Sequence, residues 1–160
     1  KSRTSKNYDQ WGRVAGEGRV NEGIVEQWLT DPYFAREAPK SLDRNRFDAR
    51  AIDFASLADG AASLTAFSAR AIARALADYA VRTLYVAGGG AHNRTMMRML
   101  HEAGGLEPQM MQALHLDGDF IEAQAFAYLA ARVDKGLALS FPTTTGVSRP
   151  MTGGQIARPD

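Results

Sequence analysis

The sequence predicts an α/β fold in which helices pack on a layered sheet. Apolar residues recur at helical spacing in two segments of the first half. A short apolar strand, Leu84–Val86, then leads into three consecutive glycines, and helix and strand signals alternate from there to residue 136. The predicted order is helix, helix, strand, helix, strand, helix, and such alternation is typical of α/β proteins.

The first helix is expected at about residues 19–29, where five apolar residues follow helical spacing: Val20, Ile24, Val25, Trp28 and Leu29. Pro32 ends it, because the residue before a proline disfavours helix. A charged loop, "REAPKSLDRNRFD", follows at 36–48. Its Lys40-Ser41 pair is a candidate ligand contact, although loops of this composition are usually only solvated.

The second helix is expected at about 57–79. A stripe of six residues should face the core: Leu64, Phe67, Ala71, Ile72, Ala75 and Leu76. Gly60 weakens the helix and marks an alternative beginning, with Asp59 as N-cap.

The strand Leu84–Val86 is apolar enough for a parallel sheet buried on both faces. After the glycines, Asn93 is a suitable N-cap for a helix of about ten residues with Met96, Met97 and Leu100 inside. Gly104 and Gly105 end that helix. A second strand is expected at 109–116, "QMMQALHL".

The last helix is expected from near Asp119 to just before Gly136. Glu122 shares a face with Phe126, Leu129 and Val133, and most of the helix should be buried. A carboxylate there is costly unless it is paired, hydrogen-bonded or at the rim of a cavity. Alternatively, Glu122 simply favours the helix dipole. Two strands are few for this much helix, so further strands are expected in the tail, in misassigned stretches or upstream of Lys1.

The glycine run leaves two interpretations open. Gly88, Gly89 and Gly90 either form a tight turn that needs positive φ, or let a ligand approach the main chain and the helix N-terminus. No Gly-Lys-Ser/Thr follows, so the run is not a Walker A loop. Asn93 stands where a dinucleotide fingerprint has its third glycine, which disfavours a nicotinamide-binding enzyme.

Composition excludes several classes of function. A net charge of +1 predicts no binding to nucleic acid or to an anionic membrane, and no apolar run approaches the ~18 residues of a membrane span. The absence of cysteine excludes disulfides and thiolate metal sites. The basic start, "KSRTSK", is expected to be a solvated end. His92, His101 and His115 form no metal-binding pattern.

Several segments together resemble the anhydro-N-acetylmuramic acid kinases, sugar kinases of the actin-like, hexokinase-like ATPase superfamily with an RNase H-like fold. These are "YDQWGRVAGEGRV", "DPYFAREAPKSLDRNRFD", "LTAFSARAIA", "LYVAGGGAHN", "EAQAFAYLAAR" and "FPTTTGVSRP". Leu42-Asp43-Arg44-Asn45 stands where the family often reads Thr-Gly-Arg-Glu.

The resemblance implies an enzyme that uses ATP and Mg²⁺ to phosphorylate the 6-oxygen of 1,6-anhydro-N-acetylmuramic acid while water opens the anhydro ring. The product, N-acetylmuramic acid 6-phosphate, enters peptidoglycan recycling in the cytoplasm. Gly88, Gly89, Gly90 and Asn93 would line the nucleotide, and Glu122 would contact the sugar.

The resemblance also implies that residues 1–160 are the C-terminal lobe of a two-lobe kinase. The phosphate-binding hairpin and the catalytic base are expected upstream of Lys1, so the isolated chain should be inactive. An alternative is a non-catalytic interaction or assembly module that joins a partner, or a second copy in a homodimer, through an exposed sheet edge.

Overall fold

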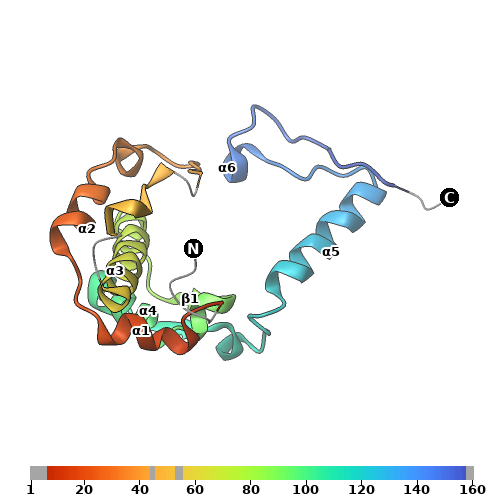
Figure 1. The fold of residues 1–160 in the computed structure, drawn as a ribbon. Helices are drawn as coiled ribbons and strands as arrows, with labels where there is room; N and C mark the ends of the chain where they lie inside the picture. Colours follow the sequence, from red (N-terminus) through yellow and green to blue (C-terminus); the bar gives the residue numbers. More distant parts are fainter. Residues whose placement is uncertain (1–6, 44–45, 53–55, 158–160) are drawn as a thin grey trace.

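A computed structural model of the chain describes residues 7–43, 46–52 and 56–157. The basic start and the pair Arg44-Asn45 lie outside the described residues. The structure contains two short strands and six α-helices within these ranges (Figure 1). The elements are α1 (Arg13–Glu17), α2 (Glu22–Leu29), α3 (Leu57–Leu76), β1 (Leu84–Val86), α4 (Arg94–Gly104), β2 (Pro108–Met110), α5 (Ile121–Asp134) and α6 (Pro142–Thr145).

The two strands form a parallel pair, with α4 as the crossover between them. Leu84 pairs with Pro108 and Val86 with Met110. The predicted α/β arrangement, helices packed on a small parallel sheet, is therefore confirmed. The second strand is shorter than expected. It ends at Met110, because a 3₁₀ turn at Met111–Leu114 follows and His115 adopts a left-handed φ of 58°.

Helices α1–α4 form a helical unit, and α3 is its centre because it contacts α1, α2 and α4. The buried face of α3 consists of small residues: Gly60, Ala62, Ser63, Ala66 and Ala69. The predicted stripe of larger residues is wrong in part. Leu64 and Ile72 are exposed, whereas Phe67 and Ala71 pack against the core of Val25, Leu29 and Ala66. Small side chains let the neighbouring helices approach closely, which apolar periodicity alone does not indicate.

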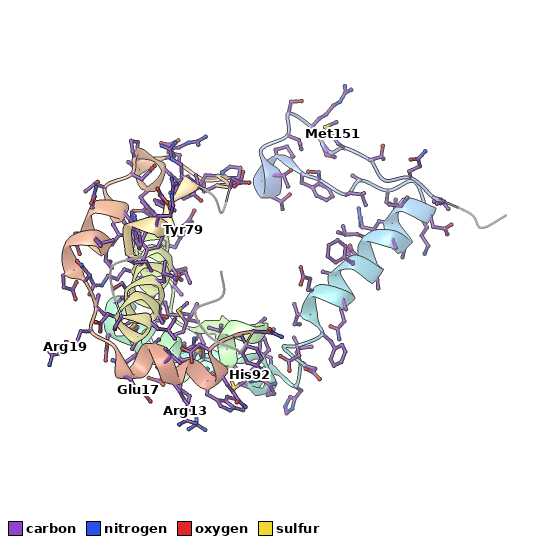
Figure 2. The ribbon with its side chains drawn as sticks, in the orientation of Figure 1. Arg13, Glu17, Arg19, Tyr79, His92 and Met151 are labelled. Atoms are coloured by element: carbon purple, nitrogen blue, oxygen red, sulfur yellow. The ribbon has the colours of Figure 1, made fainter. Side chains whose placement is uncertain are left out.

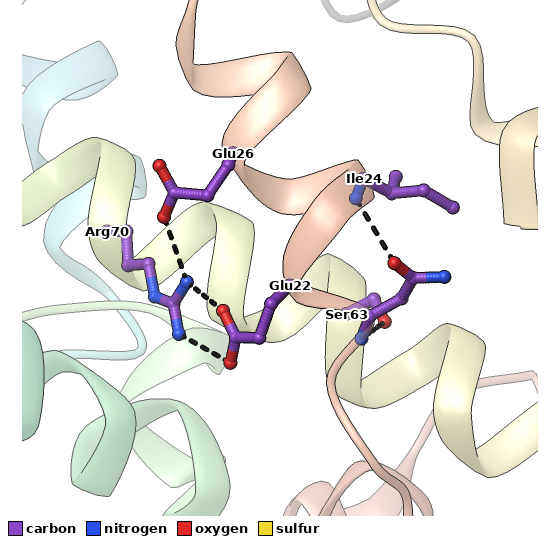
Figure 3. A network of polar contacts seen from close by, with 6 residues as sticks. Glu22, Ile24, Glu26, Ser63 and Arg70 are labelled. Carbon is purple, nitrogen blue, oxygen red and sulfur yellow. Dashed lines mark hydrogen bonds and ion pairs between the residues drawn. The ribbon is translucent and has the colours of Figure 1, made fainter.

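Helix α2 begins later than predicted, at Glu22, and Asn21 caps it by accepting a hydrogen bond from the Ile24 N–H. Arg70 of α3 contacts this first turn through a bidentate ion pair, in which its two terminal guanidinium nitrogens lie 2.5 and 3.0 Å from the Glu22 carboxylate oxygens. It also makes a longer contact to Glu26 (Figure 3). The Asn21 N–H also donates to Ser63 Oγ at 2.9 Å. Polar contacts thus fix α2 against α3 around the apolar core.

Helix α3 begins at Leu57, as predicted, and its N-cap is Ser56, so the alternative beginning with Asp59 as N-cap is wrong. Ser56 Oγ accepts from the Asp59 N–H at 3.0 Å. The Asp59 carboxylate instead joins α3 to the segment between α1 and α2, because it accepts a hydrogen bond from the Arg19 N–H at 2.6 Å. This bond, and next to it a hydrogen bond between the Ser56 side chain and the Asp59 carboxylate, lower the pKa of Asp59. Gly60 is not an interruption: it lies buried beside Ile52, with little room for a side chain.

Helix α1 was not predicted from the sequence. It is only five residues long, and close approaches of its glycines explain how it packs. A Cβ on Gly18 would lie 2.0 Å from the Ala58 carbonyl oxygen, and one on Gly16 would lie 3.0 Å from Thr95 Oγ1. The segment that contains α1 therefore lies directly on α3 and α4.

Helix α5 stands apart from α1–α4 (Figure 1). None of its residues is buried, and Phe126 and Tyr128 are 65% and 62% exposed. The prediction that most of this helix is buried is wrong for the present structure, because no described element covers its apolar face. The tail adds α6 and an antiparallel bridge between Ser140 and Met151. Over the described ranges, no helix has the length and apolar character needed to cross a bilayer.

Candidate functional site

The glycine run lies where β1 ends, and its three members have different structural roles. Gly88 has φ 73° and ψ −174°, a conformation that is essentially restricted to glycine. Gly89 and Gly90 have ordinary φ values and begin a 3₁₀ turn, Gly89–His92. A Cβ at either of them would meet no atom of the described residues within 4 Å. The turn thus requires glycine at position 88, whereas the fold gives no reason for glycine at 89 and 90.

The backbone donors of this turn are partly unused. The Gly88 N–H donates to the Gly118 carbonyl oxygen at 3.0 Å, which ties together the loops that follow the two strands. In the part of the chain that the structure describes, no group accepts from the Gly89 or Gly90 N–H. Both residues are exposed. Two main-chain donors without side chains beside them are therefore open to a ligand.

Asn93 is the N-cap of α4, as predicted. Its Oδ1 accepts from the Met96 N–H at 2.9 Å. The same side chain lies against Gly12, where a Cβ would come within 1.9 Å of Oδ1. Thr95 adds a buried hydrogen bond of 2.6 Å to the Gly12 carbonyl oxygen. Asn93 thus joins α4 to the N-terminal segment, and its Oδ1 is already engaged.

This contact brings the N-terminal segment to the glycine turn and forms a hollow of about 690 Å³ between them. Its lining comes from both segments and from the loop after β2: Tyr8, Asp9, Gln10, Trp11, Gly89, Gly90, His92, Asn93 and Asp119. The volume falls within the roughly 300–1,000 Å³ of typical small-molecule sites. Three of the four predicted nucleotide-site residues, Gly89, Gly90 and Asn93, thus line one open hollow.

His92 lies at the end of the helical unit from which the chain leads to α5 (Figure 2). Its Nε2 lies 2.8 Å from Asp119 Oδ1. A second hollow of about 450 Å³ shares Gly89 and Asp119 with the first and also contains Gly88 and Glu122. Glu122 does not lie on a buried apolar face as predicted, since it is exposed in the first turn of α5. It nevertheless opens onto the glycine turn.

Lys40 has a structural role. Its Nζ donates to the carbonyl oxygens of Tyr33, Phe34 and Arg36, at 3.4, 3.1 and 2.9 Å, at the end of a 3₁₀ turn. The Lys40 ammonium group is therefore occupied within the loop. Over the residues that the structure describes, no three His, Asp or Glu side chains are grouped so that they would hold a metal ion.

Sequence reasoning missed six residues of the larger hollow: Tyr8, Asp9, Gln10, Trp11, His92 and Asp119. Tyr8 and Trp11 reach the turn through contacts more than 80 residues apart in the sequence, which no local pattern reveals. The closely spaced glycines at 12, 16 and 18 were the available signal, because such spacing suits close backbone packing.

Comparison with known proteins places the chain in a family. A family model for anhydro-N-acetylmuramic acid kinase matches residues 1–159. A protein of that name from Methylorubrum populi is 47% identical over 99% of this chain and 43% of its own length. Another from Rhodopseudomonas palustris is 51% identical over 96% of this chain and 43% of its own length. The chain spans less than half the length of these relatives. It belongs to the anhydro-N-acetylmuramic acid kinase family.

Proposed function

We propose that the protein carrying this chain is a kinase that phosphorylates 1,6-anhydro-N-acetylmuramic acid at the 6-oxygen with ATP, with water opening the anhydro ring. Kinases of this name at 45–51% identity support the proposal. The chain would be part of the C-terminal lobe of an actin-like enzyme and would supply its adenosine-binding surface. The isolated chain would bind nucleotide without turnover.

The observation that carries the nucleotide assignment is the contrast within the glycine run. Gly89 and Gly90 have ordinary φ values, open space and free N–H groups as far as the structure describes the chain, so none of the described residues requires them to lack side chains. A ligand lying on the main chain would require it. Gly88 and Asn93 shape the turn, and Gly89 and Gly90 present their N–H groups to the nucleotide.

Glu122 is assigned to the sugar. It lines the smaller hollow, which shares Gly89 and Asp119 with the larger one. A carboxylate placed there can accept hydrogen bonds from sugar hydroxyls. No three His, Asp or Glu side chains of the described residues are grouped so that they would hold a metal ion, so no catalytic step is assigned to a metal bound by them. When ATP is bound, its γ-phosphoryl group supplies the transferable group, and this chain's contribution is to position the nucleotide.

The test is calorimetric titration of ADP into the natural protein that carries this chain. Gly89→Val and Gly90→Val should each weaken ADP binding by about ten-fold or more, because a branched side chain would occupy the space of the ligand. Gly23→Val is the matched control, since Gly23 also has an ordinary φ and room for a side chain but lies on α2. ADP affinity that is unchanged in both site variants would contradict the assignment.

A second function, as an interaction or assembly module, is favoured by the uncovered aromatic residues of α5 and its N-cap. Phe120, Phe126 and Tyr128 are all more than half exposed. We propose that these exposed aromatic side chains pack against another part of the protein or against a second copy. Light scattering coupled to size exclusion tests the second copy: a dimer that dissociates in Phe126→Ser supports it, and a monomer at all concentrations contradicts it.

A further inference from the structure

Trp11 has a backbone conformation that its own side chain disfavours. Its φ of 61° and ψ of 11° lie in the left-handed region, which a bulky residue rarely adopts. The indole is 47% exposed and lines the larger hollow together with Gly89, Gly90 and Asn93. Strained backbone beside a ligand-sized hollow is characteristic of functional positions.

Two neighbouring side chains contact the indole. The His92 ring meets it edge-on, with the ring centroids 5.9 Å apart at 83°, and Asp119 holds His92 through Nε2. The Arg94 guanidinium lies 5.9 Å from the indole centroid. The next residue, Gly12, is clamped against Asn93 and Thr95. The indole is thus preorganised without a ligand.

The polar side chains around the indole are largely occupied within the protein. The Asp9 carboxylate accepts from the Val14 and Ala15 N–H groups, each at 2.9 Å. Asn93 Oδ1 caps α4, and Asp119 Oδ1 contacts His92. The hollow therefore offers two exposed aromatic rings, those of Tyr8 and Trp11, the two glycine N–H groups and the exposed side chain of Gln10, the one amide side chain of the lining without a described hydrogen bond. This set suits a flat aromatic group better than a polyhydroxylated sugar, which needs many free polar partners.

We propose that Trp11 is the stacking surface for the nucleobase of the bound nucleotide. The inference rests on the proposed function and adds to it a residue that determines affinity for the base. The nucleobase lies against the indole while the Gly89 and Gly90 N–H groups face the rest of the nucleotide. Removing a stacking ring from a nucleobase site typically weakens binding by about ten-fold or more.

The test compares three variants of the natural protein, Trp11→Gly, Trp11→Phe and the control Trp28→Phe, by calorimetry with ADP, pyrophosphate and 1,6-anhydro-N-acetylmuramic acid. Trp28 is a suitable control because its ring is buried against Phe67, 5.2 Å away, outside the hollow. Trp11→Gly should weaken ADP binding about ten-fold or more and leave pyrophosphate and sugar binding unchanged. Trp11→Phe should recover most of the ADP affinity, and Trp28→Phe should match the natural protein.

A second measurement, by fluorescence, does not depend on the folding of Trp11→Gly. ADP should change the tryptophan emission of the natural protein and of Trp28→Phe, and this change should disappear in Trp11→Phe. If the protein binds ADP but neither its affinity nor its emission change depends on Trp11, the stacking proposal is overturned and the proposed function is not. If Trp11→Gly loses only sugar binding, the ring contacts the sugar, and the stacking proposal is again overturned. A natural protein that binds no ADP overturns both proposals.

Discussion

At the scale of single residues, the glycine turn separates a requirement of the fold from a requirement of the ligand. At position 88 the backbone angles require glycine, and at position 12 the Asn93 side chain fills the space of a Cβ. Neither reason applies to Gly89 and Gly90. The three glycines are therefore explained in two ways, by the fold at 88 and by the ligand at 89 and 90, and the same substitution should have different effects at these positions.

Gly88→Ala should lower the free energy of unfolding by about 1–3 kcal/mol, because alanine does not adopt this conformation without strain. Gly89→Ala is the matched control and should change it by less than about 0.5 kcal/mol, since its added Cβ meets nothing within 4 Å. Urea unfolding followed by circular dichroism measures both. Equal losses in the two variants would contradict the distinction.

Thr95→Val should lower the free energy of unfolding by about 1–3 kcal/mol, because it leaves the Gly12 carbonyl oxygen without its buried hydrogen bond. Thr65→Val is the matched control, since the Thr65 hydroxyl donates to Ala61 within its own helix. The same urea unfolding compares the two. A loss no larger in Thr95→Val than in Thr65→Val would show that this bond does not hold the N-terminal segment on α4.

At the scale of elements, the sequence allowed the type and order of the larger ones to be predicted, but not what each buries. The stretch Leu57–Leu76 is a helix as predicted, yet its buried face is the row of small residues around Ala62 and Ala66. Likewise, Asn93 caps α4 as predicted, but its contact with Gly12 depends on long-range packing. Local patterns determine caps and periods, whereas helix partners are set by contacts between distant segments.

Arg70→Gln should reduce the free energy of unfolding by less than about 1 kcal/mol near neutral pH, because Glu22 and Arg70 are partly solvated. The hydrogen bond from Arg70 lowers the pKa of Glu22 below its usual 4.5. A lowered folded-state pKa contributes stability above the unfolded pKa, and this stability is lost as pH falls through the folded value. The difference from the natural protein should therefore be full above pH 4.5 and shrink below it.

Urea unfolding at a series of pH values measures this difference. Arg98→Gln is the control, since Arg98 pairs with Glu102 within α4 and joins no second element. A difference between Arg70→Gln and the natural protein that grows toward acid pH would contradict the assignment.

At the scale of the whole molecule, the chain exposes more surface than a compact protein of its mass. Its accessible surface is 11760 Å², whereas a compact monomer of 17.4 kDa exposes about 7,900 Å². The excess agrees with the uncovered face of α5 and with a sheet of only two strands. The class of fold followed from the alternation of helix and strand, but the placement of α5 did not, because its apolar stripe predicts burial.

The backbone amides of the 160-residue chain should therefore fall into two groups with different rates of hydrogen exchange. Amides of α3 should exchange far more slowly than those of α5, since a helix of about 14 residues is marginal in water without tertiary packing. Mass spectrometry of peptides from the two helices measures this directly. Protection of α5 equal to that of α3 would show that α5 is covered in solution.

The hydrogen bond from Gly88 to Gly118 has a consequence for kinetics. It ties together the two loops that supply Gly89 and Asp119, the residues that line both hollows. If nucleotide and sugar occupy the two hollows, a substitution at Asp119 will alter the Michaelis constants of both substrates together. Residues that line one hollow alone, Trp11 and Glu122, are the places where the two constants can be varied separately.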